Sequence, residues 1–391
     1  MNEYSKIDCA WRVGSILLCL IAALAGALSA TGQGSGADRA LALERNGKLA
    51  EAESAWRDVV EKNPEDARAW ASLGVVRSRL QEYTQAATAY RKAIALDPKI
   101  KGIRVNLGLA EFKSNNLRGA IAPLREALTE DPQNLQARTL LGLSYYGTGQ
   151  FAEAVRHLTA ASKADAENAE LHNVLAQSCL LAKQYDCALN EFSWILKRTP
   201  DSATAHMLLG QALDGLGKTP EAVAEFEAAS KADPRIPNVN FGLGYLYWKL
   251  RRYDEAAHAF EAELAIDPRN AQALAYLGDT ELKRGNSEKA LTLVQQAVAI
   301  QSSLRVAQLD LGILLTEKKR YPEALDALKR AERLDPQQPD VHYRLGRLYQ
   351  IMGDTQNAKR EFARVEQLHQ KAEDALADKI LSGTGSPEKQ P

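Results

Sequence analysis

A Gly-Leu-Gly-Lys-Thr run at 215–219 is the part of the sequence closest to a catalytic motif, because Gly-Lys-Thr ends the loop that binds nucleotide phosphates. In that loop four residues separate two glycines, and Ala212 stands here in place of the first glycine. The loop also needs a preceding β-strand, whereas the residues around this run have a helical pattern. We therefore interpret 215–219 as a turn between helices and not as a phosphate site.

Histidines at regular spacing suggest a metal site. His172 and His206 are 34 residues apart, and equivalent positions on neighbouring helices lie about 8–10 Å apart. Zinc, with ligand bonds near 2.0 Å, does not reach two side chains at that separation without strain. His342 and Trp70 fall on multiples of the same spacing, so we interpret all four as packing residues. We expect neither a metal ion nor a cofactor.

The body of the chain contains two cysteines, Cys179 and Cys187, and the other two lie before residue 20. No Cys-x-x-Cys or Cys/His metal spacing occurs. A turn between positions 179 and 187 would bring two helices side by side, with the Cα atoms at a separation that a disulfide tolerates, roughly 4.4–6.8 Å. Two interpretations stay open: a disulfide, or two small buried apolar side chains.

Composition and charge exclude several classes of function. Lys and Arg total 49 against 50 for Asp and Glu, which gives a formal net charge of −1 with no basic block, so we expect no nucleic-acid partner. Aromatic residues make up 6%, while Ala, Leu, Glu, Lys, Arg and Gln dominate, and this composition favours an all-α fold. Serine and threonine fall mainly in turns and on solvated faces, so we expect no enzyme.

The first 32 residues have the pattern of a secretory signal. Lys6 and Arg12 precede an uncharged, mainly apolar run at 13–28, and small residues follow. We interpret 1–32 as a signal peptide or an uncleaved N-terminal membrane anchor, and a buried helix is the alternative. The sequence thus predicts an exported chain that is periplasmic, secreted or anchored, with no other contact with a membrane.

From residue 33 onward the sequence repeats every 34 residues. Prolines keep this spacing at Pro64, Pro98, Pro132, Pro200, Pro234, Pro268 and Pro336. Alanines keep it at Ala86, Ala120, Ala154, Ala188, Ala222, Ala256, Ala290, Ala324 and Ala358. Apolar residues in each repeat recur at helical spacing in two blocks with a polar turn between them, which predicts a helical hairpin. The Asp-Pro step ends the second helix, because proline disfavours helical geometry in the residue before it.

This pattern resembles the tetratricopeptide repeat family. The unit 67–100 supplies the family's residues at Trp70, Leu73, Gly74, Ala86, Tyr90, Ala93 and Pro98. We assign nine gapless repeats to 67–372 and a divergent first hairpin to 33–66, then a C-terminal capping helix at 373–382 and a disordered tail at 383–391. The resemblance implies an α-solenoid, a right-handed superhelix of stacked hairpins.

The same resemblance implies a concave groove lined by the first helix of each hairpin, at positions 2, 5, 9, 12 and 13 of the repeat. The predicted groove residues are Leu109, Phe112, Tyr146, Asn173, Gln177, Met207, Gln211, Asn238, Phe241, Tyr245, Trp248, Tyr343 and Arg347. Aromatic residues, Met and Arg are enriched at protein interfaces, although the aromatic residues could instead pack between repeats. The paired Lys and Asn with which some family members hold a C-terminal carboxylate are not matched here.

The sequence therefore predicts a non-catalytic scaffold of the cell envelope that binds other proteins, through an extended peptide or a partner helix in the groove. The alternative from another class is an envelope assembly factor for polysaccharide or lipid-linked material, because aromatic platforms also suit sugars. A weaker third interpretation is the sensory or regulatory arm of a larger complex.

Overall fold

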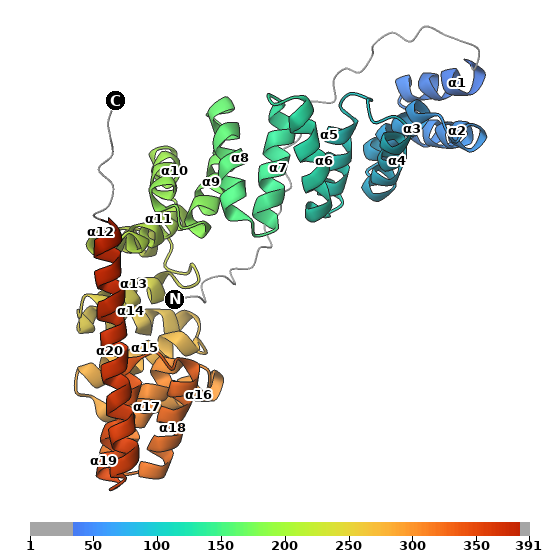
Figure 1. Ribbon diagram of the computed structural model, residues 1–391. Coiled ribbons are helices and arrows are strands. Elements are labelled where there is room, and N and C mark those ends of the chain that lie inside the picture. The colour runs from blue at the N-terminus through green and yellow to red at the C-terminus, as the bar shows by residue number, and fades with distance from the viewer. Residues whose placement is uncertain (1–33, 384–391) are drawn as a thin grey trace. The chain divides into compact units, whose positions relative to one another are not determined.

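The computed structural model describes residues 34–383, and these residues form twenty α-helices and no β-strand. The helices follow one another as antiparallel pairs (Figure 1). The chain divides into two compact units, one ending at Pro200 and the other beginning at Asp201, and each holds five of the hairpins. The predicted signal or anchor segment 1–32 lies outside the described residues, as does 384–391 of the predicted tail.

The helices of the first unit are α1 (Gly34–Arg45), α2 (Leu49–Lys62), α3 (Ala67–Arg79), α4 (Tyr83–Leu96), α5 (Ile103–Lys113), α6 (Leu117–Glu130), α7 (Leu135–Gly147), α8 (Phe151–Ala164), α9 (Ala169–Leu181) and α10 (Tyr185–Arg198). Those of the second unit are α11 (Ala203–Gly215), α12 (Thr219–Ala232), α13 (Val239–Lys249), α14 (Tyr253–Ile266), α15 (Ala271–Lys283), α16 (Ser287–Ile300), α17 (Arg305–Glu317), α18 (Tyr321–Leu334), α19 (Pro339–Ile351) and α20 (Thr355–Gly383).

Close packing within a hairpin depends on glycine in the first helix. A Cβ atom added to Gly244 would lie 2.7 Å from the ring of Phe260 on the paired helix, and one added to Gly74 would lie 2.6 Å from the ring of Tyr90. Both distances are far below a normal contact, so only glycine lets the large side chain reach the opposite backbone. The approach outweighs the roughly 1 kcal/mol that glycine costs inside a helix.

The turn inside each hairpin contains one residue with positive φ, and Gly217 is that residue between α11 and α12, with φ 76°. Gln81 has the same place and a φ of 63° in an earlier hairpin. The Gly-Lys-Thr run is therefore an ordinary hairpin turn, and its threonine begins α12.

The linkers between hairpins are fixed at both ends. Helix α4 ends at Leu96, one residue before the Asp-Pro step, as the sequence predicts. The residue before the next first helix often caps it: the Asp66 carboxylate accepts hydrogen bonds from the backbone N–H groups of Arg68 and Ala69. Such a cap contributes about 1 kcal/mol by satisfying donors that the helix leaves unpaired.

Within each unit, packing is between neighbours. Each second helix contacts the first helix of the next hairpin. Consecutive first helices also contact each other, for example α5 with α7 and α15 with α17. The segment 373–382 is the end of α20 and does not form a helix of its own, and Gly383 of the predicted tail also belongs to α20. Among residues 34–383, no helix combines the length and the apolar character needed to cross a bilayer.

Candidate partner-binding site

The structure places nearly all of the predicted groove residues on first helices of hairpins. In the first unit, Leu109 and Phe112 lie on α5, Tyr146 on α7, and Asn173 and Gln177 on α9. In the second unit, Met207 and Gln211 lie on α11, Phe241, Tyr245 and Trp248 on α13, and Tyr343 and Arg347 on α19. Asn238 is the residue just before α13. Each unit thus carries its own set of these residues.

In the first unit, hydrogen bonds join three predicted groove residues across two helices. The Tyr146 hydroxyl donates to Oε1 of Gln177 at 2.7 Å, and the Gln177 amide donates to Oδ1 of Asn173 at 3.2 Å. Asn173 is exposed and the other two are half-buried. This polar chain lies on the surface formed by α7 and α9, where a bound segment could exchange hydrogen bonds with it.

The second unit brings together an aromatic cluster, which we define as Phe241, Tyr245, Trp248, Phe260 and Tyr276. Tyr245 and Trp248 stack with ring centroids 5.9 Å apart, and the Tyr276 ring meets both edge-on, at 5.4 and 5.3 Å. Such pairs add about 0.5–1.5 kcal/mol beyond their buried area. Tyr245, Trp248 and Tyr276 are half-buried, so the outer part of the cluster stays accessible on α13 and α15.

Two carboxylates lie beside this cluster. The Trp248 indole Nε1 donates a hydrogen bond to Oδ2 of Asp279 at 2.5 Å, which fixes the indole ring. Asp310, on α17, is only 2% exposed, and its Oδ2 has no hydrogen-bond partner. Burial, and next the nearby charge of Asp279, raise the pKa of Asp310 well above its usual range. Burial also raises the pKa of Tyr276 to about 12.

Two of the predicted groove residues, Phe241 and Met207, need correction because they are buried. Phe241 is 3% exposed and packs on Phe260 and Tyr276, and Met207 is 7% exposed, so both support the surface from beneath and do not themselves meet a partner. Asn238 has positive φ, and its backbone N–H donates to Glu263 at 3.0 Å. Its side chain is exposed, so its place in the groove stays a prediction. Hydrophobic residues at helical spacing look alike whether they face solvent or the next helix, which is why the sequence alone did not separate these cases.

Tyr276, Asp279 and Asp310 are the site residues that sequence reasoning missed. The position of Asp279 carries residues of several kinds in the other repeats: Val75, Leu109, Leu143, Gln177, Gln211, Tyr245, Ile313 and Arg347. Asp279 is the one acid among these equivalents in 67–372, but the mixture of residue types gives no periodic signal for it. The position of Asp310 is equally mixed, with Ser72, Asn106, Leu140, Val174, Leu208, Gly242, Tyr276 and Arg344 in the other repeats of 67–372.

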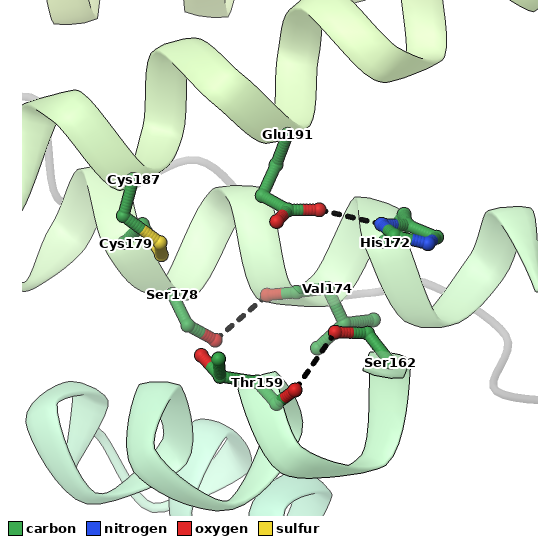
Figure 2. Close-up of a disulfide and its surroundings, with 8 residues drawn as sticks. All are labelled: Thr159, Ser162, His172, Val174, Ser178, Cys179, Cys187 and Glu191. Carbon is green, nitrogen blue, oxygen red and sulfur yellow. Dashed lines mark hydrogen bonds and ion pairs between the residues drawn. A yellow bond between two sulfur atoms is a disulfide. The ribbon is translucent and has the colours of Figure 1, made fainter. Parts of the chain in front are cut away.

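The two cysteines of the chain's body form a disulfide between α9 and α10, with Cα atoms 5.7 Å apart (Figure 2). The bond crosses the turn of one hairpin and spans a sequence separation of 8 residues. On the same two helices, Nδ1 of His172 lies 2.5 Å from Oε2 of Glu191, and Nε2 lies 3.1 Å from the carbonyl oxygen of Ala166. His172 therefore joins the two helices of a hairpin to the linker that precedes them.

Family models match most of the chain. A tetratricopeptide repeat model matches residues 139–192, 184–237 and 241–304, and two further models of the repeat match 312–353 and 339–368. The model of the cytochrome c-type biogenesis protein H TPR domain matches 45–164. The chain belongs to the tetratricopeptide repeat family. Its repeats form a helical solenoid, and repeats of this family typically act as non-catalytic scaffolds for interactions between proteins.

Individual relatives are more distant. An inactive TPR repeat-containing thioredoxin, TTL3, of Arabidopsis thaliana is 31% identical over 91 residues, which are 23% of this chain and 13% of that protein. The C-terminal part of a TPR protein from Cytophaga hutchinsonii is 20% identical, with a TM-score of 0.46 over 61% of this chain and 98% of that one. YrrB, described as a TPR protein with an unusual peptide-binding site, is 22% identical, with a TM-score of 0.38 over 48% and 97%.

Proposed function

We propose that this tetratricopeptide repeat protein is a scaffold of the cell envelope that binds an extended peptide or a helix of a partner protein. The surface that carries the proposal is the accessible part of the aromatic cluster on α13 and α15, formed by Tyr245, Trp248 and Tyr276. Interface hot spots are rich in tyrosine and tryptophan. A rigid aromatic side chain loses little conformational entropy when a partner covers it.

The hydrogen bond from Trp248 to Asp279 is the observation that most favours a binding role. Asp279 is 5% exposed, and burying a carboxylate costs free energy that a core aromatic position does not require. The bond at the ring edge holds the indole in one orientation, while a face of the ring stacks on Tyr245. A pre-oriented ring pair at a half-exposed position suits an interface better than a site of core packing alone.

Export is supported by the chemistry of the first unit. The disulfide between Cys179 and Cys187 is a bond that persists in oxidising compartments and is rare in the cytosol. Together with the signal pattern at 1–32, it favours the periplasm, secretion or an N-terminal anchor. Sequencing the N-terminus of the mature chain tests this, because a chain that still begins at Met1 in the cytosol would contradict export.

Affinity capture from the cell envelope tests the proposed function. The full chain should retain defined proteins, and the double variant Tyr245→Ala, Trp248→Ala should lose them while keeping its helical circular dichroism. Tyr253→Ala is the matched control, because this tyrosine lies in the same hairpin but on its second helix. Retention of glycan with no protein would favour the assembly-factor alternative instead.

A further inference from the structure

The last hairpin contains a histidine held between acceptors on both sides. Nε2 of His342 lies 3.1 Å from the carbonyl oxygen of Pro336, and a carbonyl only accepts, so Nε2 carries a hydrogen. Nδ1 lies 2.7 Å from Oε2 of Glu361 and 3.9 Å from Oε1 of Glu332. In the neutral ring, Nδ1 therefore carries a lone pair, and this lone pair faces two carboxylates. Such an arrangement needs a cation at Nδ1, either a proton or a metal ion.

Three features of this group match a metal site. One ligand atom from each of Glu332, His342 and Glu361 lies within 4.8 Å of the other two, which small rotamer changes bring onto a sphere of about 2.0–2.2 Å radius. The bond from Nε2 to a carbonyl is the outer contact that fixes the tautomer of a metal-bound histidine. His342 and Glu361 are buried, while the Glu332 side chain is 33% exposed and gives the ion a path from solvent.

The second carboxylate, from Glu332, distinguishes the surroundings of His342 from those of an otherwise equivalent histidine. His172 has the same two contacts, to Glu191 and to the carbonyl of Ala166. Ten residues before His172, however, Ser162 on α8 stands where Glu332 on α18 stands before His342. The Ser162 hydroxyl donates to the carbonyl of Thr159 (Figure 2). Nδ1 of His172 thus faces one carboxylate, that of Glu191. Nδ1 of His342 faces two, so one more carboxylate lies near His342 than near His172.

The geometry points to a divalent metal site of the zinc class formed by Glu332, His342 and Glu361, with a fourth position open to water. Nitrogen and carboxylate donors together suit zinc and neighbouring transition metals. Arg360, 3.3 Å from the other oxygen of Glu361, balances part of the remaining charge. Because Glu332 lies on α18 and the other two ligands on α19 and α20, the ion would fasten the last hairpin to the one before it.

Zinc titration of the metal-free full chain tests this site. Calorimetry with Zn²⁺ alone should find one strong site, and Zn²⁺ should raise the melting temperature. Glu332→Ser, which copies Ser162, should weaken the strong site by about a hundredfold or more, since loss even of an outer contact costs 10–100-fold. His172→Gln is the matched control and should leave Zn²⁺ binding unchanged.

Two results would overturn the inference. One is no strong Zn²⁺ site in the wild-type chain, which would mean that a proton alone occupies Nδ1. The other is equal Zn²⁺ affinity in wild type and Glu332→Ser, which would place any binding at other histidines or at the N-terminal cysteines. Glu332→Gln, which keeps the side-chain length, provides the same comparison if the serine variant folds poorly.

Discussion

The fourth position of the repeat has a hydrogen-bonding role that the types of residue found there do not indicate. Its side chain donates an N–H to the carbonyl of the residue six positions earlier, in the linker between hairpins. The donors with such bonds include Trp70, Arg104, Asn240, Gln308 and His342. The sequence predicted packing here because Trp70 and three histidines share this position at the 34-residue spacing. These residues share a side-chain N–H group that extends to the linker carbonyl. Only the structure shows this contact.

Gln308→Leu should remove one of these bonds with little change in volume, and the equivalent Leu274 shows that the position accepts leucine. The Gln308 amide donates to the Ser302 carbonyl at 2.9 Å. We expect the free energy of unfolding to fall by about 0.5–1.5 kcal/mol, the net value of a typical hydrogen bond. Hydrogen exchange should quicken at the start of α17. An unchanged exchange rate there would contradict the role.

Asp310→Asn should stabilise the chain at neutral pH. The pKa of Asp310 is raised by burial and then by Asp279, against the weaker opposing effects of Lys283 and Arg305. The folded chain therefore keeps a proton that the unfolded chain loses above about 3.8, so stability falls as pH rises from there toward the raised pKa. Asparagine does not titrate and avoids this loss.

Thermal melts at pH 4 and pH 7 check the Asp310 prediction. The asparagine variant should melt higher than wild type at pH 7, and the difference should shrink at pH 4, where wild-type Asp310 is protonated. Asp326→Asn, at an exposed position on α18, should change little at either pH. A lower melting temperature for Asp310→Asn at pH 7 would contradict the account.

At the scale of the element, periodicity predicted the helical hairpins, and the structure differs where the repeat itself lapses. Position 32, which is proline in most repeats, is Gln370 in the last one. Helix α20 continues past this position to Gly383 and includes the segment expected as a separate cap. The missing proline is not a sufficient cause, because α8 and α16 end at Ala164 and Ile300 although Ala166 and Ser302 replace the proline there. The helix caps at Asp66 and its equivalents were also missed, because single polar residues carry no periodic hydrophobic signal.

The disulfide between α9 and α10 should stabilise its own hairpin. For a loop of this length the chain-entropy model gives about 2.5 kcal/mol, so Cys179→Ser, Cys187→Ser should lower stability by up to that amount. Hydrogen exchange should quicken in α9 and α10 and stay nearly unchanged in α3 and α4. Thiol labelling of the denatured, unreduced chain provides the second check, and two reactive thiols from these positions would exclude the bond.

At the scale of the whole molecule, contacts within each unit are local, so stability should depend on how many neighbours a hairpin has. The α5/α6 hairpin is packed by α4 on one side and by α7 on the other. The α1/α2 hairpin packs only against α3 among the described residues. Amides in α5 and α6 should therefore exchange more slowly than those in α1 and α2, and equal protection would contradict nearest-neighbour stabilisation.

The repeat and its family were predictable because the same pattern occurs ten times, so a substitution at one position of one repeat does not hide it. The binding surface was predictable only in part. Tyr245 and Trp248 lie half-exposed on α13, as expected, whereas Met207 and Phe241 are buried. The acids beside the aromatic cluster come from other repeats, and their proximity to Trp248 depends on how successive first helices stack, which a single repeat does not encode.

The most direct test of the central claim is selection of peptides from a displayed random library on the full chain, followed by affinity measurement with purified peptides. We expect peptides that bind wild type and Tyr253→Ala equally. The same peptides should bind Tyr245→Ala, Trp248→Ala at least about thirtyfold more weakly, which is the loss of affinity expected for a hot spot. Peptides that bind the folded double variant as tightly as wild type would contradict the claim that this aromatic surface is the partner-binding site.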